Sequence, residues 1–193
     1  MKELRVTQIT AETRAEPTAA GEALILSGRP IVYDAPTVIK DAAGSYTEII
    51  RGGALDGADL SDVRLLFNHD INRVPLARTP KTMELKTDAA GLSFSATLAN
   101  TEQARTVYEA VKRGDLSGMS FAFTVPEGGD YYDAATNTRT ISKIAKVYEC
   151  SIVPYPAYPQ TSVEARSVQA AALERHKAKQ AAKILINQIL KVR

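Results

Sequence analysis

The chain has 193 residues, of which 45% are hydrophobic and 24% charged, so disorder is not the default and there are enough apolar side chains for a core. Twenty-four Lys and Arg against 22 Asp and Glu give a net charge of +2, too near neutral for a protein built to hold nucleic-acid phosphates. The single cysteine, Cys150, excludes an intramolecular disulfide and a cysteine-rich metal site. No apolar run approaches the roughly 20 residues of a membrane span. We therefore expect a cytoplasmic protein, or one enclosed in a particle assembled there, that contacts neither membrane nor nucleic acid directly.

Three stretches of the chain differ in pattern. Residues 1–21 have little apolar periodicity and could form an N-terminal arm or a leading strand. In residues 22–160, short β-branched and aromatic runs alternate with turn residues, which predicts a largely β domain. The remaining residues, 161–193, lack Gly and Pro and are rich in Ala, Glu, Lys, Gln and Leu, which predicts a helical tail. The apolar end of that tail, 184–190, needs a partner surface, either the domain or another chain.

Within the β domain the pattern predicts seven strands. Two turn sequences, Asp88–Gly91 and Pro126–Gly129, are expected to connect hairpins. The expected strands are Ala23–Tyr33, Tyr46–Ile50, Val63–Phe67, Thr82–Thr87, Gly91–Leu98, Leu116–Val125 and Ile141–Val153.

One helix is expected inside this domain. Asn100 is a suitable residue to cap its first turn, and Gly114 follows as a stop. Apolar side chains recur at helical spacing between them, which predicts that one helix face packs on the sheet. They are Ala104, Val107, Tyr108 and Val111.

Two histidines are present, and their surroundings differ. His176 lies in a charged run of the predicted tail helix, where a solvated side chain is the simplest interpretation. His69 ends an apolar strand at a polar turn, a usual place for a functional group carried on a rigid scaffold. Taken alone, His69 is better explained as a hydrogen-bonded residue at a strand end.

Ser120 lies in a segment with an unusual alternation of side-chain size. In a strand, Met119, Phe121 and Phe123 share one face. Ser120 shares the other face with Gly118 and Ala122, which predicts an open face where a peptide can approach a nucleophilic hydroxyl. On the pattern alone, the better interpretation is the solvent face of an edge strand or the surface on which a helix packs. Ser117 is a rival nucleophile, on the large-residue side and nearer the turn.

A serine and histidine pair needs a third group that fixes the imidazole tautomer, and an acid is expected here. Glu149 is our choice, because a carboxylate in the middle of an apolar strand is costly unless it has a partner. A salt bridge to one of the many Lys or Arg is the alternative role. Asp70, the neighbour of His69, is the alternative acid, but adjacent strand residues point to opposite faces.

Three segments resemble, in order and spacing, the signature blocks of the prohead maturation proteases of tailed bacteriophages. They are Leu65–Asp70 (LLFNHD), Gly114–Phe123 (GDLSGMSFAF) and Tyr148–Ala157 (YECSIVPYPA). The resemblance covers about residues 23–165, and three blocks in order are more specific than one. The family most often has Gly where this chain has Ala122, a small residue in place of a smaller one.

The resemblance implies a fold similar to the herpesvirus assembly protease: mainly β with helices (α+β), a closed β-barrel surrounded by helices. It also implies an order of His69, Ser120 and a third member, for which Glu149 is a placement by position. Herpesvirus enzymes use a second histidine there, which this β domain lacks. Such enzymes cleave the scaffold, or a scaffold-like extension of the capsid protein, inside the prohead, and usually themselves.

The expected chemistry is acyl transfer by Ser120 with His69 as general base and no metal or organic cofactor. Cys150 is a minor alternative nucleophile, since a thiol inside an apolar strand usually packs as a small hydrophobe. Two other roles stay open: an inactive barrel that serves as a capsid scaffold or assembly module, and a tail that binds the capsid interior or associates with itself.

Overall fold

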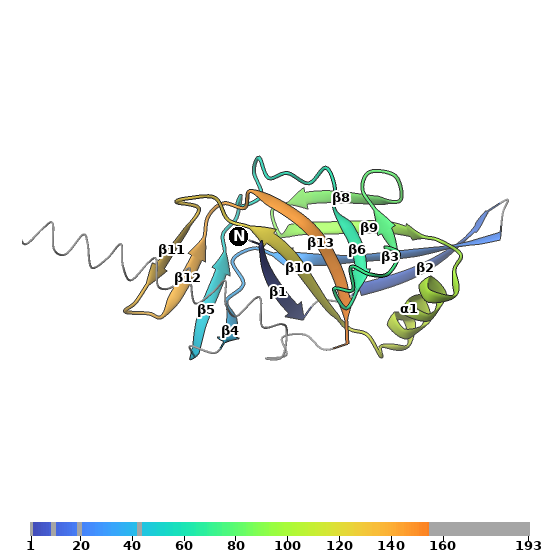
Figure 1. Cartoon of the computed structure of the whole chain (residues 1–193), viewed down its shortest axis with the longest axis horizontal. Helices are drawn as coiled ribbons and strands as arrows, with labels where there is room; N and C mark the ends of the chain where they lie inside the picture. The colour runs from blue at the N-terminus through green and yellow to red at the C-terminus, as the bar shows by residue number, and fades with distance from the viewer. Residues whose placement is uncertain (1, 9–10, 19–20, 42–43, 155–193) are drawn as a thin grey trace, which may run out of the picture.

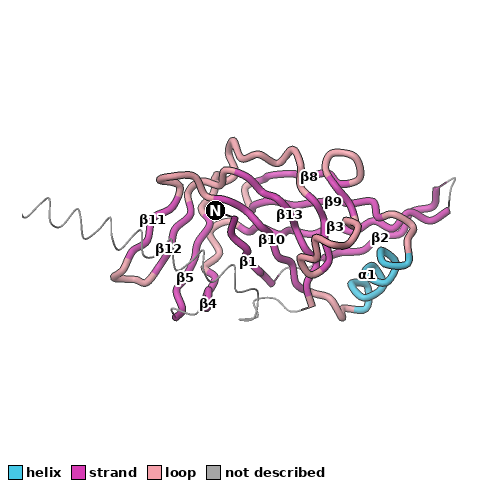
Figure 2. Tube along the Cα trace, viewed as in Figure 1, coloured by secondary structure: helices cyan, strands magenta, loops and turns pink. Residues whose placement is uncertain are grey.

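The computed structural model describes residues 2–8, 11–18, 21–41 and 44–154. Over these ranges the chain has thirteen strands and one helix. Figures 1 and 2 show how the strands and the helix are arranged. The expected tail helix and His176 lie outside the described residues. In chain order the elements are β1 (Lys2–Gln8), β2 (Ala11–Thr18), β3 (Gly21–Val32), β4 (Thr37–Asp41), β5 (Gly44–Ile50), β6 (Arg64–Phe67), β7 (Ala77–Arg78), β8 (Met83–Asp88), β9 (Gly91–Leu98), α1 (Glu102–Arg113), β10 (Gly118–Thr124), β11 (Asp130–Asp133), β12 (Thr138–Ile141) and β13 (Lys146–Val153).

The strands form three hydrogen-bonded sheets. Their orders are β1-β10-β13-β6-β7, β11-β12-β5-β4 and β2-β3-β9-β8. A mainly β fold with a helix is confirmed, but the closed barrel surrounded by helices is not found in the described part of the chain. The reason is that each sheet ends in two edge strands, and no ladder among the described residues joins one sheet to the next.

The five-stranded sheet contains Ser120, Glu149 and Cys150, and the turn that follows its strand β6 contains His69. Its strand β10 lies between β1 and β13 and is antiparallel to both, whereas β13 and β6 run parallel. Figure 1 shows this arrangement, with β1 and β13 on opposite sides of β10. As a result, three segments far apart in the sequence come together at this sheet. They are β1, the turn after β6, and β13.

The core contains the large side chains of β10. Met119, Phe121 and Phe123 are fully buried, as the alternation predicted, and the rings of Phe121 and Phe123 stack with centroids 5.2 Å apart. Burying one such side chain stabilises the fold by about 2–3 kcal/mol. The expectation of an open small-residue face is wrong, because Ser120 and Ala122 are also fully buried.

Helix α1 forms where the apolar spacing predicts it, and its four apolar residues are buried. Its cap is not the expected one. Thr101 is the N-cap, and its side-chain oxygen accepts a hydrogen bond from the Ala104 amide at 3.2 Å. Asn100 instead accepts a hydrogen bond from Arg105. Gly114 ends the helix in the left-handed conformation, with φ 83°, as a C-cap glycine does.

Turn sequences were predicted with mixed success. Asp88 and Gly91 close the β8–β9 hairpin, and a side chain at Gly91 is impossible because its Cβ would lie 2.0 Å from the Ile31 carbonyl oxygen. Residues 126–129, by contrast, do not connect a hairpin, since β10 and β11 belong to different sheets. The expected strand 141–153 is in fact the end of β12 and the whole of β13.

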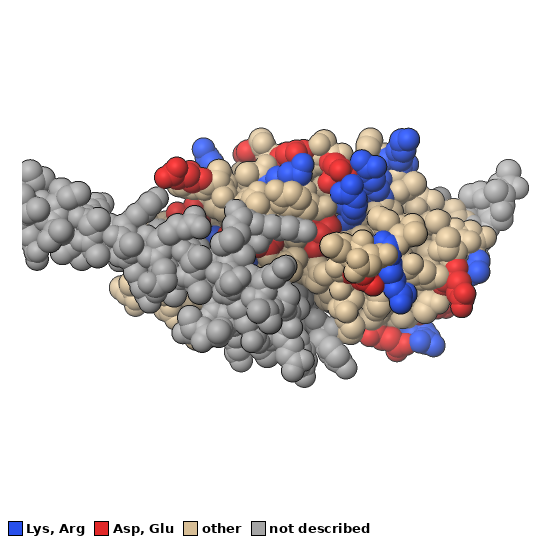
Figure 3. All heavy atoms as spheres, in the orientation of Figure 1, with Lys and Arg blue, Asp and Glu red and all other residues tan. Residues whose placement is uncertain are grey.

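The visible surface of the described residues carries mixed charge. Figure 3 shows Lys and Arg interspersed with Asp and Glu over this face, in keeping with the net charge of +2. Among the described residues, no helix is long and apolar enough to cross a membrane.

Candidate active site

His69 is held by a turn that follows β6. Asn68 and His69 both adopt left-handed backbone angles, φ 51° and 59°, which are uncommon for residues with a side chain. The turn is fastened to β13 by two hydrogen bonds: the Asn68 amide donates to the Ile152 carbonyl at 2.9 Å, and the His69 amide donates to the Ser151 hydroxyl at 3.2 Å. The local strain is thus offset by contacts that fix where the imidazole points.

Glu149 lies next to the imidazole of His69. Its Oε1 is 2.7 Å from His69 Nδ1, and its Oε2 accepts a hydrogen bond from the Ser151 hydroxyl at 2.5 Å. A carboxylate only accepts, so Nδ1 carries the proton and Nε2 of a neutral ring is left with a free lone pair. That lone pair is what a general base needs.

Ser120 lies on the neighbouring strand, directly opposite Ser151. Side chains of directly opposite antiparallel residues share a face with Cβ atoms about 5 Å apart, so Ser120 belongs on the same face as the Glu149 and Ser151 cluster. Its hydroxyl, however, donates a hydrogen bond to the Arg5 carbonyl oxygen at 2.7 Å. His69 Nε2 is buried and has no hydrogen-bond partner among the described residues.

The other residues considered for chemistry lie elsewhere. Asp70 accepts a hydrogen bond from the Asn72 amide at 3.0 Å and forms an ion pair with Arg73, so the contacts of its carboxylate are within its own loop. Ser117 is exposed in the segment before β10. Cys150 is fully buried opposite Phe121 on β13, and burial, with the nearby Glu149 charge, raises the pKa of its thiol well above the ordinary value. The structure therefore brings Glu149, and not Asp70, to His69.

Strand β1 closes the edge of β10 next to Ser120. It pairs with β10 along its whole length, with Arg5 opposite Phe121 and Val6 opposite Ser120. Without β1, β10 would be the edge of the sheet, and an extended peptide could pair there. The peptide group between Arg5 and Val6 thus occupies the place beside the Ser120 hydroxyl.

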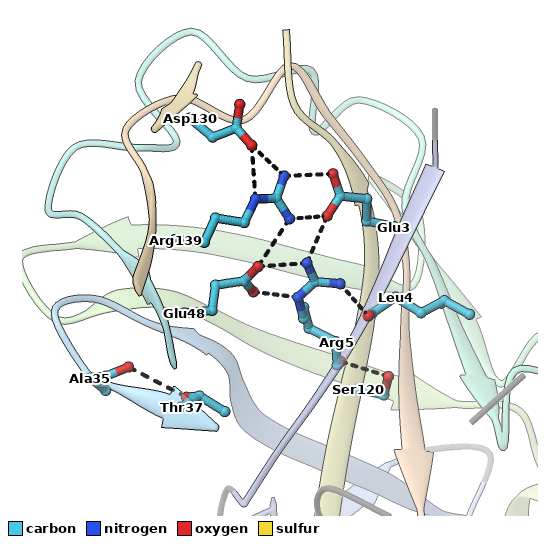
Figure 4. A network of polar contacts seen from close by, with 9 residues as sticks. All are labelled: Glu3, Leu4, Arg5, Ala35, Thr37, Glu48, Ser120, Asp130 and Arg139. Atoms are coloured by element: carbon cyan, nitrogen blue, oxygen red, sulfur yellow. Dashed lines mark hydrogen bonds and ion pairs between the residues drawn. The ribbon is translucent and has the colours of Figure 1, made fainter. Parts of the chain in front are cut away.

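A buried network of charges holds β1 in this position (Figure 4). The Arg5 guanidinium contacts Glu48 on β5 and, at 2.7 Å, Glu3 on its own strand. Arg139 on β12 contacts the same two carboxylates, at 2.8 Å from Glu3 Oε1 and 3.0 Å from Glu48 Oε2, and also binds Asp130. The network joins β1, the strand beside Ser120, to the sheet β11-β12-β5-β4.

Electrostatics inside this network follow from burial and pairing. Burial acts to raise the pKa of Glu3, but the hydrogen bond from Arg139 and the charge of Arg5 outweigh it, so the pKa is lowered from 4.5. Burial acts to lower the pKa of Arg5 and of Arg139, yet the carboxylates of Glu48 and Glu3 raise both. Glu3, Arg5 and Arg139 therefore stay charged, as buried charges do only when paired.

Ser151 and Arg5 were missed by the sequence reasoning. Ser151 had a usable signal, because it stands two residues after Glu149 and so shares its face of the strand. Arg5 had none, since a charged residue in a short polar segment is normally solvated. Within the described ranges, no group of His, Cys, Asp and Glu is arranged to hold a metal ion.

A serine hydroxyl, an imidazole and a carboxylate that orients the imidazole are the groups from which serine hydrolases are built. Comparison with known families narrows this class. The family described as caudovirus prohead serine protease matches residues 9–177, so the chain belongs to that family. It is thus a member of a family of phage prohead serine proteases, which act in the assembling capsid.

One of the solved structures similar to this chain is that of the bacteriophage T4 capsid assembly protease, gp21. The two are 10% identical, with a TM-score of 0.46, over 80% of this chain and 99% of that one. A search of curated proteins found no match.

Proposed function

We propose that this chain is an active serine endopeptidase in which Ser120 is the nucleophile, His69 the general base and Glu149 the acid that orients the base. The observation that carries the proposal is the 2.7 Å contact between His69 Nδ1 and Glu149 Oε1, which leaves Nε2 free. Family membership supports it, as do the positions of Ser120 and Ser151 on adjoining strands.

Hydrolysis proceeds through an acyl-enzyme. The Ser120 oxygen attacks the scissile carbonyl carbon while its proton passes to His69 Nε2, and Glu149 stabilises the imidazolium that results. The C–N bond then breaks as His69 returns this proton to the leaving amine. Water, deprotonated by His69, attacks the ester and restores Ser120 with release of the carboxylic acid.

Proteins of the prohead are the proposed substrates: the scaffold, or a scaffold-like extension of the major capsid protein, cleaved inside the assembling capsid in the host cytoplasm. The chain itself is a further proposed substrate. Support for self-cleavage comes from β1, whose Arg5 carbonyl is the group that the Ser120 hydroxyl touches. We also propose that copies of the chain associate with one another through the C-terminal tail.

The resting arrangement must rearrange before reaction. At present the Ser120 proton is donated to the Arg5 carbonyl oxygen and not to His69. Attack requires this proton to turn toward Nε2 and the carbonyl oxygen to move off the hydroxyl. An inactive assembly module, the alternative function, would keep the resting arrangement permanently.

A serine-reactive phosphonate separates the two functions. We expect the wild-type chain to be labelled at Ser120 and to cleave its capsid substrate, and Ser120→Ala and His69→Ala to do neither. Ser117→Ala is the matched control and should behave as wild type, because Ser117 is an exposed serine three residues away. Cleavage of the capsid substrate by the Ser120→Ala chain would show that another group is the nucleophile.

A further inference from the structure

We propose that the edge of β10 that β1 occupies is a peptide-binding site with two charged subsites. In it Glu48 takes a basic side chain at the residue whose carbonyl faces Ser120, and Arg139 takes an acidic side chain two residues earlier. The site therefore selects extended segments of the pattern acidic–any–basic, with cleavage after the basic residue. This inference rests on the proposed function and adds its substrate class.

The subsite for the basic side chain is a pocket between two sheets. The Arg5 side chain lies over the Phe123 ring, 5.4 Å from its centroid, and reaches Glu48 on β5. Glu48 is 3% exposed, and its two oxygens accept two separate N–H groups of the guanidinium. Such a fork-to-fork pair is specific to arginine geometry.

The pocket is nearly filled by its present occupant. A cavity of only about 20 Å³ remains beside Arg5, lined in part by Ile50 and Phe121. This is room for one water, so a lysine whose ammonium is bridged to Glu48 also fits, whereas a larger side chain does not. A short apolar side chain would leave the Glu48 carboxylate buried beside a void, which is costly.

The acidic subsite is on the same face of β1. Glu3 stands two residues before Arg5, and both its oxygens are bound by Arg139, which Asp130 holds from the other side. Arg139 lies on β12 opposite Glu48 of β5, so one register pair supplies both subsites. The residue between them, Leu4, faces the other way and is not selected by charge.

The register of β1 connects these subsites to the chemistry. Because the Ser120 hydroxyl touches the Arg5 carbonyl oxygen, the bond at risk is the one between Arg5 and Val6. A peptide bound in this register presents the carbonyl of its basic residue to Ser120. Attack there breaks the C–N bond to the next residue, in the steps described above.

Matched peptides test this selection with the full chain as enzyme. One peptide copies residues 1–12, a second carries Arg5→Met and a third carries Glu3→Gln. Loss of a charged hydrogen-bonded partner costs about 10- to 100-fold in kcat/KM, so we expect the Arg5→Met peptide to be cut at least about tenfold more slowly. Mass spectrometry should place the cut between Arg5 and Val6.

Variants of the enzyme test whether Glu48 selects the basic side chain of the peptide. In Glu48→Gln, the ratio of kcat/KM between the parent and Arg5→Met peptides should fall by about tenfold or more. Because this is a ratio within one preparation, partial unfolding of the variant cancels. Glu109→Gln is the matched control, since Glu109 is an exposed residue of α1 with 57% of its side chain accessible, and it should keep the wild-type ratio.

The outcomes separate this inference from the function on which it rests. Equal cleavage of the parent and Arg5→Met peptides, or an unchanged ratio in Glu48→Gln, overturns the subsites while leaving the protease intact. Cleavage by Ser120→Ala overturns the protease assignment instead. If no peptide is cut, binding of fluorescent peptides to the Ser120→Ala chain decides: at least about tenfold tighter binding of the parent peptide supports the subsites, and equal or absent binding overturns them.

Discussion

Strands β1, β10 and β13 of the five-stranded sheet separate two polar clusters. The clusters differ in how completely their polar groups are hydrogen-bonded. On the Ser120 face, His69, Glu149 and Ser151 are linked, but His69 Nε2 has no partner in the described part of the chain. On the Phe121 face, two guanidinium groups and three carboxylates contact one another (Figure 4). A closed network fixes geometry, whereas an acceptor left over is available for proton transfer.

The comparison predicts that the first cluster governs rate. Glu149→Gln should lower kcat by about 10,000-fold with little change in thermal stability, because an amide can donate to Nδ1 and so favour the wrong imidazole tautomer. Peptide hydrolysis and thermal unfolding are the two measurements. Asp70→Asn, the matched change in the neighbouring acid, should keep nearly full activity; a larger loss there than in Glu149→Gln would reverse the assignment of the orienting acid.

The second cluster should govern stability. Arg139→Met removes the partner of three buried or half-buried carboxylates and should lower the free energy of unfolding by about 3–5 kcal/mol. Arg29→Met is the control, because Arg29 and Asp88 form an ion pair at the surface that is worth about 1 kcal/mol or less. Urea unfolding measures both. Equal losses in the two variants would mean that the buried network stabilises the fold no more than a surface pair does.

The charged network should also make the stability of the protein depend on pH, which is a smaller effect than the loss in Arg139→Met. Burial would raise the pKa of Glu3, but Arg139 and Arg5 lower it from 4.5, so the folded state binds a proton less readily than the unfolded chain. The stability due to Glu3 is therefore fully present above about pH 4.5 and is lost as the pH falls through the folded-state pKa.

Urea unfolding of the wild type and Glu3→Gln at several pH values measures this contribution. The gap in unfolding free energy between them should be largest near neutral pH and should narrow in acid. For Glu109→Gln, an exposed control, the gap should stay small throughout. A Glu3→Gln gap that widens as the pH falls would give the opposite sign and contradict the pairing of Glu3 with the two arginines.

How much of the structure could be predicted depends on how far apart interacting residues lie along the chain. Helix α1 was predicted well because its signals lie within a few residues of one another, and the face alternation of β10 gave the correct core side chains. The charged network was not predictable in this way: Arg5 and Glu48 are 43 residues apart, and Glu3 and Arg139 are 136 apart. Each alone resembles a solvated charge, so the pairing of β1 with β10 beside Ser120 was not expected.

The same reasoning applies to Cys150, which lies on β13 beside Glu149 but belongs to the opposite face. Its thiol is fully buried, and burial raises its pKa well above the ordinary value, so the reactive thiolate is scarce. We expect native protein at pH 8 to resist iodoacetamide, to react completely after unfolding in urea, and to keep peptidase activity in Cys150→Ala. Mass spectrometry follows the labelling. Rapid alkylation of native Cys150 with loss of activity would mean that the thiol, and not the Ser120 hydroxyl, lies on the reactive side of the sheet.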